Sequence, residues 1–199
     1  PLNSLFVDGV RALGYEGAAS AMPSFSGWGM AAGLVFAALL PAVCEELIFR
    51  GCILANARSA AGDVPAIFIS AFLFALYHGS IQQTLYQFAC GCIFALIALR
   101  SGSVLPSMLA HFLNNAAIVV LGGLGLLDAS GNLAAPDWVF VLLVSLGALA
   151  LAGSLAFLVK GFKPVGAAGA RPASGSLFAW ASAGIFLMSL IWVLDLFSL

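Results

Sequence analysis

Three ionisable residues, Glu45, Glu46 and Arg50, lie in the apolar segment PAVCEELIFRG at residues 41–51. A charge at the centre of a bilayer costs between about 2.5 and more than 10 kcal/mol, so such residues neutralise one another or take part in chemistry. Glu46 and Arg50 are four residues apart and share a helix face, which predicts a structural ion pair. Glu45 lies about 100° round the helix from Glu46, which makes it the candidate for the chemical step. The alternative is that all three residues form one structural cluster.

The chain has only two histidines, and both occur in apolar segments. His78 ends the sequence FALYH at residues 74–78, and His111 begins HFLNN at residues 111–115. His111 and Asn115 are four residues apart and therefore share a helix face. Taken singly, these residues have structural interpretations, namely a helix end, interior packing and hydrogen bonding between helices. Their coincidence with the carboxylates favours one shared site.

A carboxylate and a histidine can together act as a general base for water, and side-chain N–H groups can stabilise an oxyanion. These types of residue predict a peptide hydrolase in which Glu45 and His78 activate water. His111 and Asn115 would then hold the oxyanion that develops on the substrate carbonyl. Three residues next to the same motifs are candidates for the substrate pocket: Phe74, Gln82 and Asn114.

The composition places these residues in a membrane protein. Of the 199 residues, 63% are hydrophobic and 8% are charged, whereas a soluble domain has roughly 45–50% apolar and about 25% charged residues. The formal net charge of −1 argues against a nucleic-acid partner. The lipid bilayer is therefore the expected environment of the chain. The four cysteines lack metal-site or disulfide spacing and are expected to serve as small helix-packing residues.

Six apolar segments are long enough, or nearly long enough, to cross about 30 Å of hydrocarbon. They lie at residues 28–55, 64–79, 82–100, 104–124, 137–160 and 176–198. They predict an all-α fold, a polytopic transmembrane helix bundle of about six spanning or partly spanning helices, with the catalytic site within the membrane. The second segment is short and ends in His78, so its helix is expected to stop within or near the membrane.

The domain organisation follows from these segments. Residues 1–26 are predicted to form an N-terminal interfacial segment, which would follow upstream helices that are missing from this sequence. Residues 27–199 are predicted to form a single transmembrane helical domain, with a catalytic core at about 41–120. Basic residues gather in alternate connections, near 56–63, 100–103 and 160–175. By the positive-inside rule, these connections are predicted to be cytoplasmic in a multi-pass protein.

Three short motifs resemble those of a known family, and they occur in its order. EELIFR at residues 45–50 matches an E-E-x-x-x-R signature, FALYH at 74–78 an F-x-x-x-H motif and HFLNN at 111–115 an H-x-x-x-N motif. This set resembles the CAAX prenyl endopeptidase and bacteriocin-processing family, also called the abortive-infection membrane protease family. The resemblance implies a glutamate-dependent intramembrane endopeptidase, and we expect it to need no cofactor. Its substrate would be a membrane-associated or lipid-anchored peptide, including a peptide in bacteriocin processing.

Two alternatives belong to other functional classes. A zinc-dependent membrane peptidase would use Glu45, His78 and His111 as ligands, which is an acceptable set for catalytic zinc. The sequence H-E-x-x-H, typical of many zinc peptidases, is absent. The other alternative is a non-enzymatic membrane scaffold or immunity factor that retains the fold.

Overall fold

The computed structural model describes residues 2–14 and 27–126 of the chain. In these ranges all regular secondary structure is helical, as predicted. The described residues form two compact units, one containing residues 2–14 and 47–96 and the other containing residues 27–46 and 97–126. The predicted segments 137–160 and 176–198, and the basic connection near 160–175, lie outside the described residues.

The first long apolar segment forms a continuous helix that changes its hydrogen-bond register twice. Two π-helical stretches interrupt it, η1 (Leu34–Leu39) and η2 (Leu47–Leu54). The α-helical parts are α2 (Trp28–Gly33), α3 (Leu40–Glu46) and α4 (Ala55–Ala61). The helix runs beyond the predicted end at residue 55 because ANARSAA, the sequence of α4, is rich in alanine, which strongly favours helix.

Three further helices agree with the predicted segments to within one or two residues. They are α5 (Asp63–Tyr77), α6 (Ile81–Ser101) and α7 (Leu105–Gly123). A short helix that was not predicted, α1 (Leu2–Ala12), lies near the N-terminus. The short second segment indeed ends next to His78, which follows the last residue of α5.

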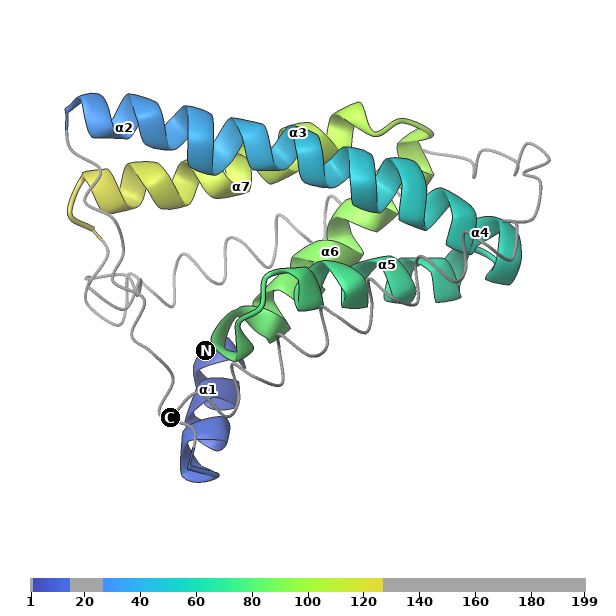
Figure 1. The fold of residues 1–199 in the computed structure, drawn as a ribbon, viewed down its shortest axis with the longest axis horizontal. Coiled ribbons are helices and arrows are strands. Elements are labelled where there is room, and N and C mark those ends of the chain that lie inside the picture. Colours follow the sequence, from blue (N-terminus) through green and yellow to red (C-terminus); the bar gives the residue numbers. More distant parts are fainter. Residues whose placement is uncertain (1, 15–26, 127–199) are drawn as a thin grey trace. The chain divides into compact units, whose positions relative to one another are not determined.

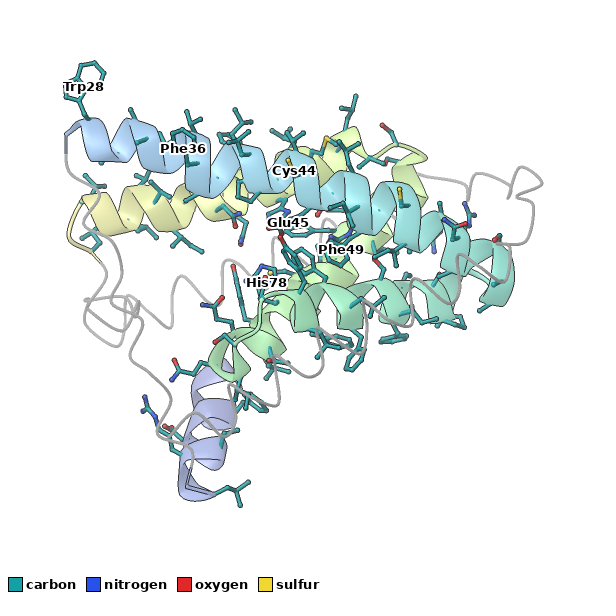
Figure 2. The ribbon with its side chains drawn as sticks, in the orientation of Figure 1. Trp28, Phe36, Cys44, Glu45, Phe49 and His78 are labelled. Carbon is teal, nitrogen blue, oxygen red and sulfur yellow. The ribbon has the colours of Figure 1, made fainter. Side chains whose placement is uncertain are left out.

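Three helices in the described part of the chain are long and apolar enough to cross a membrane: Trp28–Ala61, Ile81–Ser101 and Leu105–Gly123. Helix α5 is apolar but shorter. Large apolar side chains lie on the outside of these helices, including Trp28, which is 92% exposed, and Phe36, which is 70% exposed (Figure 2). Such exposure would be costly in water, but hydrocarbon tails solvate these side chains.

In the unit of residues 27–46 and 97–126, α7 packs along α2, η1 and α3 (Figure 1). A buried stripe of small residues, Gly33, Ala38 and Ala42, leads along the long helix to Glu46. Its first step is five residues, which is the repeat of the π-helical stretch that it crosses, and its later steps are four. The stripe therefore brings Glu46 onto the buried side of α3.

In the unit that contains residues 47–96, α4 and α5 form a hairpin that turns at Gly62. Gly62 has φ of 85°, a conformation that favours glycine. Arg58 spans the turn and binds Asp63, with 2.6 Å between Nε and Oδ1. Helix α6 approaches α5 closely at Gly91, where an added Cβ would lie 2.8 Å from the Cα of Ala71. The absence of a side chain at Gly91 therefore permits this close packing of α6 on α5.

Candidate active site

Glu46 and His111 are joined across the helix pair of α3 and α7. Nδ1 of His111 lies 3.0 Å from Oε1 of Glu46. Glu46 is fully buried and His111 is 3% exposed. Each side chain lies on the buried face of its helix, so the contact follows from the packing of α7 on α3. Hydrogen bonds between a charged group and a buried partner are among the stronger ones in proteins.

The same imidazole also faces Glu45. Its Nε2 lies 3.9 Å from Oε2 of Glu45, which is beyond hydrogen-bond distance but within the range of a strong electrostatic interaction. The Glu45 side chain is 13% exposed. The imidazole ring thus has a carboxylate near each nitrogen, with Glu46 at Nδ1 and Glu45 at Nε2. Such a group can exchange protons with a reactant while its ring is held in one orientation.

Asn115 lies on the same face of α7 as His111. The buried face of α7 contains Ser107, His111 and Val119, which are spaced by multiples of four residues. Asn115 falls in the same spacing and is partly exposed. Nδ2 of Asn114 donates to Oδ1 of Asn115 at 3.2 Å. With its carbonyl oxygen accepting this bond, Asn115 offers its amide N–H groups as donors, which is the property that the predicted oxyanion role requires.

His78 caps the end of α5, in the other unit (Figure 2). Its Nδ1 lies 2.8 Å from the backbone oxygen of Phe74. A carbonyl oxygen can only accept, so Nδ1 carries the hydrogen and a neutral ring has its lone pair on Nε2. The chain turns away immediately afterwards at Gly79, whose φ is 59°. His78 is therefore held in the tautomer of a base that acts through Nε2.

Arg50 is buried in η2 among groups that the sequence analysis did not foresee. Its Nη2 donates to the backbone oxygen of Gly91 at 2.9 Å, and its guanidinium packs against the ring of Phe74. In the chain, Phe74 on α5 lies 24 positions from Arg50 and Gly91 on α6 lies 41 positions from it. No periodicity in the sequence could have indicated these contacts. The ion pair predicted between Glu46 and Arg50 joins residues of different units and stays a prediction.

The candidates for the substrate pocket have different surroundings. Phe74 is fully buried, Gln82 lies partly exposed in the first turn of α6, and Asn114 is partly exposed on α7 next to Asn115. Their assignment to a pocket stays a prediction. Among residues 2–14 and 27–126, no group of three or more His, Cys, Asp or Glu side chains is placed so that it could hold a metal ion. The alternative zinc site would take His78 from one unit and Glu45 and His111 from the other, so it also stays a prediction.

The family model described as type II CAAX prenyl endopeptidase Rce1-like matches residues 27–117. This segment, somewhat less than half of the chain, is similar to the Rce1-like family. It contains all three motifs, from Glu45 to Asn115, so the resemblance drawn from those motifs is confirmed for this part of the chain. No curated protein and no solved structure shows significant similarity to the chain.

The matching family model is named for an endopeptidase. Three apolar helices of membrane-spanning length agree with an integral membrane protein. Both the Glu45–Glu46 pair and His111 lie inside the Rce1-like segment and on helices of this kind.

Proposed function

We propose that the protein is an intramembrane endopeptidase, which hydrolyses a peptide bond in a membrane-associated peptide or protein. The observation that carries this proposal is the His111 ring between the carboxylates of Glu45 and Glu46, at 3.9 and 3.0 Å. Glu46 and His111 are buried on apolar helices, where ionisable residues are costly and are by default functional. The Rce1-like match over residues 27–117 supports the same reaction class.

In the proposed mechanism, Glu45 and His78 activate a water molecule by removing its proton. The Nδ1–H···O bond of His78 to Phe74 supports this role because it leaves the lone pair on Nε2. The hydroxide oxygen forms a bond to the carbonyl carbon of the substrate while the carbonyl π electrons move to its oxygen. Collapse of this intermediate breaks the C–N bond, and the proton taken from water passes to the leaving amine.

His111 and Asn115 donate hydrogen bonds to the oxyanion in this mechanism. To donate to the oxyanion, His111 needs a hydrogen on Nε2. A second proton lies in the contact between His111 and Glu46, bound either to Nδ1 of the imidazole or to Oε1 of the carboxylate. The Glu46–His111 pair then has no net charge during the attack. A pair without net charge suits a buried site, since an unbalanced charge there would have to be desolvated.

The substrate class we propose is a peptide held at the membrane, either by a lipid anchor or as a segment of a membrane protein. A lipid anchor would bring the scissile bond to the membrane, where the apolar helices carry the E-E pair and His111. The name of the Rce1-like family refers to prenylated CAAX peptides, which makes a prenylated peptide the first substrate to test.

The decisive experiment compares wild-type protein with Glu45→Gln in proteoliposomes. We expect wild-type protein to release the C-terminal fragment of a prenylated CAAX peptide and Glu45→Gln to release almost none. Asp8→Asn, which removes an exposed carboxylate on α1, is the matched control and should cleave normally. Peptide termini compared in cell membranes containing the wild type or Glu45→Gln would identify other substrates.

Three outcomes would contradict the proposal. Normal cleavage by Glu45→Gln would remove Glu45 from the chemistry. Loss of activity on chelation, restored by zinc with stoichiometric metal in the purified protein, would favour the zinc peptidase. Full biological function of Glu45→Gln without any altered peptide termini would favour a non-enzymatic scaffold or immunity factor.

A further inference from the structure

Arg50 in η2 is surrounded by aromatic rings from its own helix and from its neighbours. The carbon at the centre of its guanidinium lies 4.6 Å from the ring centroid of Phe74, 5.4 Å from that of Phe94 and 5.9 Å from that of Phe49. All three distances are within the range of cation–π attraction, about 6 Å. Arg50 is 3% exposed, so this attraction acts in a site without bulk water.

The guanidinium also connects η2 to the backbone of α6. Its Nη2 donates to the oxygen of Gly91 at 2.9 Å. Gly91 is a point of close approach between α6 and α5, because a Cβ there would lie 2.8 Å from the Cα of Ala71. Arg50 therefore connects η2 to α6 at this close approach. The Phe74 ring contacts the guanidinium from α5, so a shift of the ring would change its contact with Arg50.

Phe74 in turn holds His78 in two ways. The two rings contact each other edge to face, with centroids 4.7 Å apart and an interplanar angle of 65°. The backbone oxygen of Phe74 accepts the Nδ1–H of His78 at 2.8 Å. This oxygen belongs to the last turn of α5, where helical carbonyls lack partners further along the helix. The carbonyl fixes the tautomer, and the ring fixes the direction of the imidazole.

We propose that Arg50 and Phe74 are positioning residues for His78, in addition to any role of Arg50 in an ion pair. In this proposal, the guanidinium locks the Phe74 ring, and Phe74 holds His78 with the hydrogen on Nδ1 and the basic lone pair on Nε2. The inference rests on the proposed function, in which the lone pair on Nε2 helps to remove a proton from water. The tautomer itself is measurable whether or not the protein is a peptidase.

The test uses the small number of histidines. Protein labelled with ¹⁵N-histidine contains two imidazole rings, those of His78 and His111, and a His111→Gln variant assigns the signals. The variants are Phe74→Leu, which keeps the backbone oxygen and removes the ring, and Arg50→Lys, which keeps the charge and removes the planar fork. The matched control is Phe72→Leu on the same helix, whose side chain is 53% exposed and lies outside this cluster.

We expect His78 of the wild type and of Phe72→Leu to show the Nδ1–H tautomer. In Phe74→Leu the imidazole loses the ring that fixes its direction, so its Nδ1–H should no longer stay aligned with the backbone oxygen of residue 74, and the signal should move toward a mixture of tautomers. We also expect kcat to fall about tenfold to 100-fold with little change in KM, because a catalytic group misplaced by about 1 Å costs on the order of 100-fold. Arg50→Lys should show the same change in a weaker form, since lysine retains the cation but not the geometry of the fork.

Two results would overturn the proposal. One is a wild-type His78 with its hydrogen on Nε2. The other is a folded Phe74→Leu protein with the wild-type tautomer and wild-type kcat. Failure of the proposed function gives a different pattern, in which Glu45→Gln cleaves normally while the His78 signal still responds to Phe74→Leu.

Discussion

Nδ1 of His111 lies 3.0 Å from Oε1 of Glu46, and the two residues are 65 positions apart in the chain. The contact gives the second glutamate of the E-E pair a partner on α7, in addition to the ion pair predicted from its spacing with Arg50. It also separates the two glutamates, because Glu45 faces the other nitrogen of the same ring at 3.9 Å. This difference leads to separate predictions for the two carboxylates.

Replacement of Glu46 is expected to destabilise the protein. Glu46→Ala removes a fully buried partner of His111, and breaking a buried ionic or hydrogen-bonded pair typically costs about 3–5 kcal/mol. We therefore expect a lower melting temperature in detergent, together with lower activity. An unchanged melting temperature would show that the contact with His111 contributes little to stability.

Arg50→Ala should also lower the melting temperature, because it removes the hydrogen bond to Gly91 and the packing on Phe74.

Replacement of Glu45 is expected to act on turnover rather than on stability. Glu45→Gln keeps the volume of the side chain and removes the general base, whose loss typically costs about 10²–10⁴-fold in rate. The melting temperature should stay the same or rise. Thermal melts and cleavage measured on the same purified protein check both parts. If Glu45→Gln cleaves normally while a well-folded Glu46→Gln is inactive, the roles of the two glutamates are reversed.

Gly91→Ala is expected to force α5 and α6 apart. The added Cβ would lie 2.8 Å from the backbone Cα of Ala71, and overpacking of this kind typically costs about 1–3 kcal/mol. The carbonyl of Gly91 would move with the backbone, so its hydrogen bond with Arg50 should weaken as well. Thermal unfolding in detergent measures the effect. Gly9→Ala, where a Cβ meets nothing within 4 Å, is the control and should unfold at or slightly above the wild-type temperature, because alanine favours helix more than glycine does.

The predicted topology can be tested with single cysteines in a background without the four native cysteines. A cysteine at Ala167, in the predicted cytoplasmic connection, should react with a membrane-impermeant reagent only after permeabilisation. A cysteine at Ser130, on the predicted opposite side, should react in intact cells. Both positions lie outside the described residues. The reverse pattern would invert the orientation and leave the proposed site unchanged.

The sequence alone indicated α5, α6 and α7, and it indicated the family whose model matches residues 27–117. Apolar runs at residues 64–79, 82–100 and 104–124 predicted α5, α6 and α7 closely, because the length of an apolar run and its Gly and Pro boundaries are local properties. Glu45 and Asn115 delimit three ordered motifs, and these motifs were enough to indicate the family that matches residues 27–117. Spacing also showed correctly that His78 follows the end of a short helix.

The tertiary structure decided which groups the polar side chains contact. η2 begins at Leu47, and its i→i+5 hydrogen bonds give a rotation per residue that an apolar sequence pattern does not reveal. The contacts of Glu46 with His111 and of Arg50 with Gly91 and Phe74 join distant helices. Helical periodicity specifies the face of a helix on which a residue lies, whereas the packing of neighbouring helices determines which groups meet that face.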